Sequence, residues 1–181
     1  MSHNFGPVAL REYDIRGIVG KTLADADAYA IGRTFGTIIA REGGKCVAVG
    51  YDGRLSSPVL EAALVKGLTE SGMDVIRVGL GPTPMLYYAE AILDGVDGGI
   101  QITGSHNPAD YNGFKMVKAH GPFYGDDIQR LGAMAAAGDW ESGQGLVSEH
   151  DIEDAYVARL ARDYPGRAFR IGWDAGNGAA G

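Results

Sequence analysis

The sequence predicts a three-layer α/β/α domain with a mixed, mostly parallel sheet, followed by an incomplete second α/β domain. Short apolar runs that are typical of buried strands alternate with longer segments whose apolar residues recur every three or four positions. Glycine is abundant, at 29 residues, and falls at the ends of these segments, where strands and helices connect. This alternation is the pattern of right-handed βαβ units, in which helices cover both faces of a sheet.

The first helix is expected over residues 25–42, because its apolar residues share one helical face and two glycines follow it. A buried strand is predicted next at 46–49. Ser57 and Pro58 then supply the N-cap and the first-turn residue of the second helix. The alternation continues with that helix at 59–69, a strand at 73–78, a helix at 84–93 and a strand at 99–103.

Two loops are expected to share a cleft at one edge of this sheet. Residues 51–54 follow one parallel strand and Ser105 follows another, and the carboxyl ends of parallel strands border the ligand cleft in such sheets. Within the first loop, Asp52 and Arg54 are interpreted as a structural pair that holds the loop.

A hairpin is predicted after the serine. Residues 114–118 follow the turn dipeptide Asn112-Gly113, so we expect a strand that pairs antiparallel to the preceding strand or lies near it. This arrangement would bring Lys115 back toward Ser105. A helix at 126–137 completes the domain.

The polar, glycine-rich segment at 139–145 indicates a linker or a crossing segment. We therefore expect a first domain at 1–148 and the truncated beginning of a second domain at 149–181. The second part is predicted to hold a helix at 151–164 and a strand at 168–174. An unfinished domain of this kind exposes a strand edge and apolar helix surface, which favours self-association.

Composition excludes several classes of function. The net charge of -7 and the pI near 5.0 argue against a nucleic-acid partner, which would require a basic stripe. No stretch approaches the roughly 20 apolar residues of a membrane span, and the N-terminus lacks the pattern of a signal peptide. Cys46 is the single cysteine, so a disulfide framework is excluded and the thiol is expected to be a small core hydrophobe. These features predict a protein of the reducing cytoplasm.

The most informative stretch is T-G-S-H-N-P at 103–108, which follows a strand-like run and places Ser105 on a sharply turned loop. Serine, asparagine and proline are ordinary turn residues, so the stretch alone would indicate a plain loop. Lys115 lies ten positions later, and Arg16 lies upstream in the run Y-D-I-R-G. A hydroxyl nucleophile accompanied by two cations indicates phosphate chemistry.

Three other site types receive less support. Residues 176–181 fit the dinucleotide pattern G-x-G-x-x-G, but neither a following helix nor an acidic residue some 20 positions later is present. Ser105 does not lie in the G-x-S-x-G elbow of serine hydrolases, and His106 is its sequence neighbour, which is a poor position for a general base. The four histidines show no spacing typical of zinc ligands.

Five motifs occur in a fixed order along the chain. They are R-x-Y-D-I-R-G at 11–17, V-G-x-D-G-R-x-S at 49–56, P-T-P-M at 82–85, T-G-S-H-N-P at 103–108 and Y-N-G-x-K at 111–115. On these motifs the chain resembles the N-terminal domain, and the start of the second domain, of the α-D-phosphohexomutases, the phosphomannomutase/phosphoglucomutase family. It departs from that family at Tyr51, where arginine is common.

The resemblance implies a mutase that interconverts hexose 1-phosphate and hexose 6-phosphate, of mannose or glucose, through a phosphoserine and a bisphosphorylated sugar. Ser105 matches the phosphoserine. Arg16 and Lys115 match its catalytic partners, one for transition-state charge and one for acid/base work, and the sequence leaves open which does which. Tyr13 and His106 match positions near the substrate, although a tyrosine packed over the sheet edge and a histidine that braces its own loop are equally compatible.

The resemblance also implies Mg²⁺, bound in part through the phosphate on Ser105, and glucose 1,6-bisphosphate as activator. The expected partner is a phosphosugar. The family's metal, sugar-selecting and phosphate-clamping loops belong to later domains without a counterpart in these 181 residues. We therefore expect this fragment alone to be inactive. The alternative is a stand-alone module that binds a phosphate or phosphosugar without turning it over.

Overall fold

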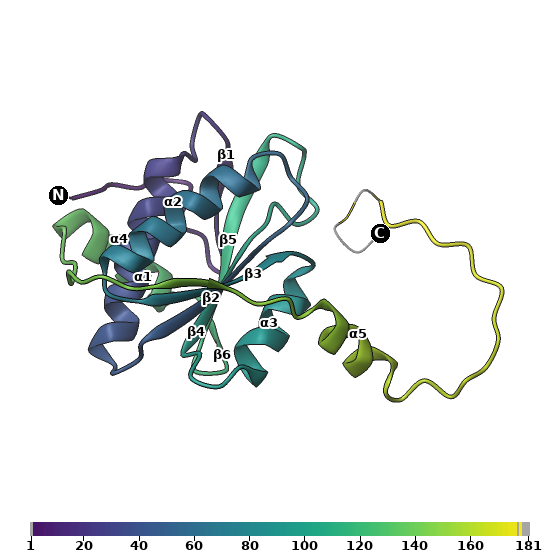
Figure 1. The fold of residues 1–181 in the computed structure, drawn as a ribbon. Coiled ribbons are helices and arrows are strands. Elements are labelled where there is room, and N and C mark those ends of the chain that lie inside the picture. Colours follow the sequence, from purple (N-terminus) through teal and green to yellow (C-terminus); the bar gives the residue numbers. More distant parts are fainter. Residues whose placement is uncertain (1, 177, 179–181) are drawn as a thin grey trace.

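A mixed β-sheet with helices on both faces forms the body of the protein (Figure 1). The computed structural model describes residues 2–176 and 178. The elements are β1 (Ile15–Ile18), α1 (Asp25–Arg41), β2 (Cys46–Tyr51), α2 (Ser57–Glu70), β3 (Asp74–Leu80), α3 (Thr83–Ile92), β4 (Gly98–Ile102), β5 (Tyr111–Lys118), β6 (Gly121–Phe123), α4 (Asp126–Ala137), β7 (Val147–Glu149) and α5 (Glu153–Ala161). Every strand and helix that the sequence predicts up to residue 137 is present.

The strand order is β1-β5-β4-β2-β3-β7. Strand β6 pairs with residues 116–118 of β5, beyond the part that pairs with β1. Strands β4, β2, β3 and β7 are parallel neighbours, whereas β5 runs antiparallel to β1, β4 and β6. The prediction that β5 pairs antiparallel with the preceding strand is therefore confirmed. Strand β5 is antiparallel to all the other strands, which share one direction, so the sheet is mixed and mostly parallel, as predicted.

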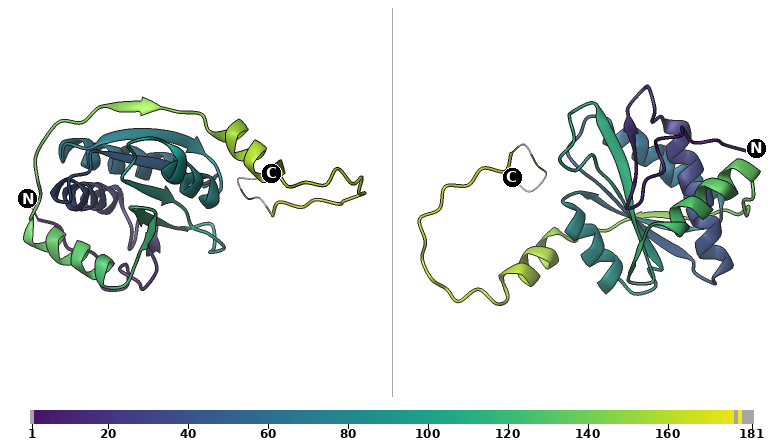
Figure 2. Two further views of the ribbon diagram at one scale, coloured as in Figure 1. Left: turned by 90° about the horizontal axis from the view of Figure 1, so that it is seen from below. Right: turned by 180° about the vertical axis from the view of Figure 1, so that it is seen from behind.

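Helices lie on both faces of the sheet (Figure 2). Two hydrophobic cores fill the spaces between the sheet and these helices, which makes the three layers. The alternation of side chains along β2 shows this directly, because Val47 and Val49 enter the larger core whereas Ala48 enters the smaller one. Helices α1, α2 and α4 cover the larger core, and α3 covers the smaller. The α/β/α architecture is confirmed.

Glycine permits an unusually close approach of α1 and α2. A Cβ atom on Gly32 would lie 2.3 Å from the carbonyl oxygen of Leu64, and one on Gly67 would lie 2.3 Å from that of Tyr29. The two helices pack backbone to backbone at this point, which lies in the second half of α2.

One detail at that start differs from the prediction. Ser56 is the N-cap residue and Ser57 is already helical, with no capping hydrogen bond from either side chain. The hydroxyl of Ser57 instead donates to Oδ1 of Asp52 at 2.7 Å. Pro58 occupies the first turn, as expected.

Beyond α4, the segment at 139–145 crosses the end of α1 and leads into β7. Arg41 forms ion pairs with Asp139 and Glu141, and the indole of Trp140 donates to Oγ1 of Thr34 at 2.8 Å. Strand β7 then pairs parallel with β3, with Val147 opposite Val75. The predicted boundary near residue 148 falls inside this strand.

The second part of the chain departs from its prediction. Helix α5 is shorter than the expected 151–164, and no strand forms at 168–174, where the backbone is irregular and exposed. A strand needs a hydrogen-bonding neighbour, and Figure 1 shows this segment looping away from the sheet. The glycine-rich run expected at 176–181 lies largely outside the described residues.

Two expectations about composition can be compared with the structure. Cys46 is half-buried at the start of β2 and packs beside the smaller core, and burial raises the pKa of its thiol to about 11. A thiol of this kind is an inert packing group, as predicted. None of the helices within residues 2–176 and 178 combines the length and apolar character that a bilayer-spanning segment requires.

Candidate functional site

The backbone of Ser105 adopts a left-handed conformation, with a φ of 53°, and the residue is exposed. A positive φ is uncommon for a residue with a side chain and is often found at functional turns. The turn is closed by local bonds: the Ser105 N–H donates to Oγ1 of Thr103 at 2.8 Å, and Asn107 donates both its backbone and side-chain N–H to the Gly104 carbonyl at 3.0 Å. We refer to residues 103–108 as the serine loop.

The serine loop and the loop at 52–56 line one cavity of about 710 Å³, so the prediction of a shared cleft is confirmed. Ser105, His106 and Asn107 line it together with residues 52–56, and Gly176 and Gly178 of the C-terminal segment also border it. Tyr51 was expected in the same cleft, but it lines a different cavity. The reason is that Tyr51 is still part of β2, and the turn away from the sheet begins after it.

His106 lies close to the serine hydroxyl despite being its sequence neighbour. Its Nδ1 is 3.3 Å from Oγ of Ser105, and both residues are exposed. Among the described residues, no side chain orients the other nitrogen of this ring. A serine-hydrolase arrangement needs a third group in that position, so the contact does not form a triad.

Arg16 and Lys115 meet at one carboxylate. Nη2 of Arg16 lies 2.5 Å from Oδ2 of Asp14, and Nζ of Lys115 lies 3.6 Å from the same oxygen. Arg16 and Asp14 are buried, whereas the Lys115 side chain is 27 % exposed. Nε of Arg16 is buried without a hydrogen-bond partner in the described part of the chain.

The sheet places this cluster near the serine loop without direct contact. Arg16 of β1 is opposite Gly113 of β5, and the carbonyl of Gly113 accepts the N–H of Thr103 at 2.9 Å. Arg16 is therefore about two strand spacings, roughly 10 Å, from the strand end that delivers Ser105. No hydrogen bond or ion pair within residues 2–176 and 178 joins Ser105 to Arg16 or Lys115.

Tyr13 belongs to an aromatic cavity beside Lys115. The ring of Tyr13 stacks on that of Tyr124 with centroids 6.2 Å apart, and Tyr13 is 69% exposed. Both tyrosines line a cavity of about 460 Å³ with Lys115 and Tyr87. Burial raises the pKa of Tyr87. Aromatic faces beside a cation suit a ligand that carries both apolar C–H groups and an anion.

Comparison with known proteins identifies the scaffold. The family model described as phosphoglucomutase/phosphomannomutase, alpha/beta/alpha domain I, matches residues 7–140. The chain belongs to this family. The serine loop, Arg16, Lys115 and Tyr13 all lie within the matched part of the chain.

Relatives agree with this assignment. The phosphomannomutase/phosphoglucomutase of Pseudomonas aeruginosa is 45% identical over 172 residues, which cover 94% of this chain and 37% of that protein. A phosphoglucomutase of Neisseria gonorrhoeae is 45% identical over 174 residues, which cover 94% and 38%. A solved structure of a Burkholderia thailandensis phosphoglucomutase/phosphomannomutase family protein superimposes with a TM-score of 0.84 at 44% identity, over 88% of this chain and 36% of that one. The chain thus spans less than two fifths of the length of these relatives.

The residues present do not form a magnesium site by themselves. No group of three or more His, Cys, Asp or Glu side chains that could hold a metal ion occurs in the described ranges, 2–176 and 178. Mg²⁺ prefers near-octahedral coordination by oxygen. A single phosphate on Ser105 would leave most of that coordination to groups from elsewhere.

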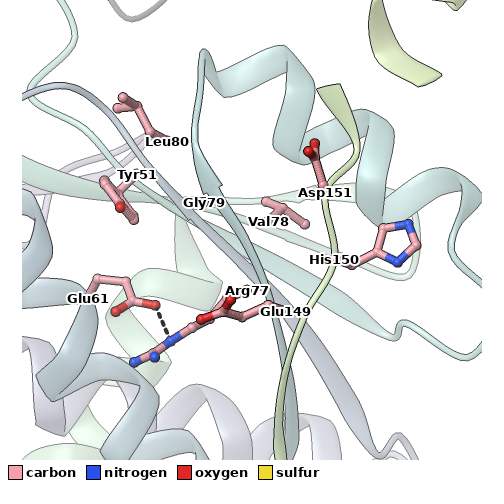
Figure 3. Close-up of a pocket in the computed structure, with 9 residues that line it drawn as sticks. All are labelled: Tyr51, Glu61, Arg77, Val78, Gly79, Leu80, Glu149, His150 and Asp151. Atoms are coloured by element: carbon pink, nitrogen blue, oxygen red, sulfur yellow. Dashed lines mark ion pairs between the residues drawn. The ribbon is translucent and has the colours of Figure 1, made fainter. Parts of the chain in front are cut away.

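A further cavity, of about 410 Å³, lies over the ends of β2, β3 and β7 (Figure 3). Nε of Arg77 lies 2.8 Å from Oε1 of the buried Glu61, an ion pair in which the N–H is not aimed at that oxygen. Burial raises the pKa of Glu61, an effect that the charge of Arg77 reduces. Glu149 adds a second carboxylate. With one ion pair and two further carboxylates, Glu149 and Asp151, the lining carries excess negative charge, which disfavours an anionic ligand in this cavity.

Sequence reasoning missed three groups that lie beside Arg16 and Lys115 in the structure. Asp14 lies within the motif R-x-Y-D-I-R-G, and an acidic residue two positions from the candidate arginine was a usable signal. Tyr87 and Tyr124 carry no such signal, because only the fold brings α3 and the end of β6 together beside Lys115.

Proposed function

We propose that this chain supplies the phosphoryl-carrying part of a phosphohexomutase, which interconverts the 1-phosphate and 6-phosphate of mannose or glucose. The observation that carries the proposal is the exposed Ser105 hydroxyl, held at a left-handed turn in the domain that matches the family. In the proposed reaction, Oγ of Ser105 attacks a phosphorus atom of a hexose 1,6-bisphosphate. The bond from that phosphorus to the sugar oxygen breaks, Ser105 loses its hydroxyl proton, and the sugar oxygen gains one.

Arg16 is assigned the role of stabilising the negative charge on the transferring phosphoryl group. Its ion pair with Asp14 fixes the guanidinium, and a fixed, planar guanidinium supports a role in holding phosphate oxygens. Lys115 is assigned to proton transfer, since its ammonium is more exposed and can reach a substrate hydroxyl.

Tyr13 and His106 are assigned to the substrate. The aromatic cavity that Tyr13 shares with Lys115 supports binding of a sugar ring, with the ring's C–H face on the aromatic groups and its phosphate toward the cation. The contact of His106 with the serine hydroxyl supports a hydrogen bond from its ring to the phosphate.

The remaining elements of the proposal concern the complete protein. Mg²⁺ would be bound partly by the phosphate on Ser105, with carboxylates from outside the described residues, and glucose 1,6-bisphosphate would act as activator. The 181-residue chain alone would be inactive, and its place would be the cytoplasm. The exposed side chains of Val157, Leu160 and Tyr164 on and after α5 favour self-association.

A mass measurement tests the serine. The chain is incubated with glucose 1,6-bisphosphate and Mg²⁺, with Ser105→Ala as control, and the intact mass is recorded. A phosphate-sized increase in the parent chain that is lost in the variant is expected. The same incubation is repeated with a full-length relative in which the serine equivalent to Ser105 is replaced by alanine. If the 181-residue chain shows no mass increase in either incubation, the proposal is contradicted. Binding of glucose 1-phosphate without any transfer would instead favour the stand-alone binding module.

A further inference from the structure

The guanidinium of Arg54 collects four backbone carbonyls in and just after the serine loop. Nη2 donates to the carbonyls of Ser105 at 3.2 Å and Asn107 at 2.7 Å. Nη1 donates to those of Pro108 at 2.6 Å and Tyr111 at 2.8 Å. A loop of irregular backbone thus has its acceptors satisfied by one side chain from another loop.

Asp52 accepts hydrogen bonds both from Arg54 and from the serine loop. Its Oδ2 accepts from Nε of Arg54 at 3.3 Å and from the N–H of Gly104 at 3.0 Å. Its Oδ1 accepts from the Arg54 N–H at 3.1 Å. The serine loop is therefore held by an acceptor at its start and by donors along the rest of its length.

A buried extension ties this pair to the body of the fold. Ser57 donates to Asp52, and the side chain of Asn112 donates to the hydroxyls of Ser56 at 2.9 Å and Ser57 at 3.0 Å. Ser57 and Asn112 are completely buried. The motif D-G-R-x-S and the asparagine of Y-N-G-x-K, which the proposed reaction leaves without a role, thus form one network beneath the serine loop.

We propose that Arg54 is a positioning residue for the phosphoryl carrier. Its guanidinium holds the serine loop in the turn that keeps Ser105 left-handed and its Oγ directed outward, and it draws the partial negative charge of four carbonyl oxygens toward itself. The role in phosphoryl transfer rests on the proposed function, whereas the effect on the loop does not.

The geometry requires arginine and not simply a cation. Five N–H donors in a planar fork serve four carbonyls and a carboxylate at once, whereas an ammonium group with three donors on a flexible stem cannot span them. The neighbouring backbone is adapted to the fork, because a Cβ on Gly104 would lie 2.1 Å from Cζ of Arg54. The Arg54 side chain is only 15% exposed, so solvent does not replace these contacts readily.

The test compares Arg54→Lys, which keeps the charge, with Arg54→Ala supplemented with methylguanidinium, in the 181-residue chain. Arg41→Lys is the matched control, since Arg41 also forms a forked ion pair but lies far from the serine loop, at the end of α1. Amide hydrogen exchange is measured for Gly104, Asn107 and Tyr111, whose N–H groups are bonded within this region. The rate of phosphate uptake by Ser105 is measured by intact mass.

We expect Arg54→Lys to accelerate exchange of these three amides about tenfold or more, while amides of β2 and β4 and the midpoint of thermal unfolding change little. Methylguanidinium should restore protection in Arg54→Ala, and Arg41→Lys should behave as the parent. Phosphate uptake should fall about tenfold in Arg54→Lys and recover with methylguanidinium.

Three results would overturn the inference. Unchanged exchange in Arg54→Lys would remove the positioning role. Acceleration spread evenly over the sheet would make Arg54 a brace of the whole domain. A loosened loop with undiminished phosphate uptake would separate Arg54 from the chemistry. If the parent chain takes up no phosphate, the proposed function fails on its own test, and the exchange data still decide whether Arg54 orders the loop.

Discussion

The guanidinium of Arg16 donates to the carboxylate of Asp14 across 2.5 Å, and both side chains are at most 10% exposed. The same carboxylate oxygen lies 3.6 Å from Nζ of Lys115. One buried acid therefore fixes both cations of the candidate site. Without it, a buried guanidinium would lose its counter-charge, and the two cations would repel each other across a region of low dielectric constant.

Replacing Asp14 with asparagine should lower the free energy of unfolding by about 3 kcal/mol, because one partner of a buried ion pair is removed. Urea denaturation at neutral pH measures the effect. Asp139→Asn is the control, since Asp139 also pairs with an arginine but is exposed, and solvent screens that pair. Equal losses of unfolding free energy in the two variants would show that burial does not make the Asp14 ion pair more stabilising than the exposed Asp139 pair.

Gly113 controls how closely β1, and with it Arg16, approaches β5. A Cβ at this position would lie 2.4 Å from the carbonyl oxygen of Ile15 and 3.2 Å from Cα of Arg16. Both are backbone atoms, so an alanine can be accommodated only if β1 moves. Gly113→Ala should cost about 1–3 kcal/mol of stability by overpacking and should shift the backbone amide resonances of Ile15 and Arg16.

Gly6→Ala is a suitable comparison for this variant, because the nearest atom to its Cβ would be 4.0 Å away. If Gly113→Ala leaves the amide resonances of β1 where they are in the parent, the close approach of the two strands is not required.

The elements that the sequence predicts are those with a local signal. Helix α1 begins where predicted and ends one residue early, because its apolar stripe and the two following glycines are properties of the segment itself. Strand β7 was missed because its three residues, Val147–Glu149, are exposed and largely polar, and pairing with β3 alone makes them a strand. The strand expected at 168–174 fails for the converse reason: it has an apolar pattern but no neighbour.

The candidate site shows the same division. Motifs identify Ser105, Arg16 and Lys115, and the shared cleft follows from the rule for parallel strands. The function of Arg54 could not be predicted to the same depth. Most of its partners are backbone carbonyls, which carry no signal in the sequence. The sequence therefore indicated only Asp52, a charged side chain, as a partner.

The ion pair of Glu61 and Arg77, drawn in Figure 3, gives a prediction about pH. Burial raises the pKa of Glu61 above its ordinary value of 4.5, so the folded state holds the proton more tightly than the unfolded state does. Stability from this group is therefore greatest below about pH 4.5 and is lost as the pH rises through the raised pKa. Glu61→Gln cannot ionise and should lack this loss.

Urea denaturation of the parent and of Glu61→Gln checks this expectation over a pH range from about 4, near the ordinary carboxyl pKa, up to about 8. The stability of the variant relative to the parent should rise with pH and then level off. A relative stability that falls with pH would mean that the attraction of Arg77 outweighs burial and lowers the pKa of Glu61.

The two tryptophans allow a matched test of where the first domain ends. Trp140 is half-buried, donates to the buried Thr34 and lies under the guanidinium of Arg33, whose Cζ is 5.1 Å from the ring centroid. These contacts hold the segment that leads to β7 against α1. Trp173 is 78% exposed and follows α5 in the irregular segment.

Trp140→Ala should lower the free energy of unfolding by about 2–3 kcal/mol, somewhat less than the loss for a fully buried aromatic residue. It should also speed hydrogen exchange of the Val75 amide, which donates to the carbonyl of Leu146 just before β7. Trp173→Ala should change neither quantity. This outcome would support a folding unit that continues through β7 to about residue 149, so that a second domain begins only with the connection to α5. If Trp140→Ala leaves Val75 fully protected, β7 is held by its pairing with β3 alone, and the crossing segment at 139–145 behaves as the linker that its composition suggests.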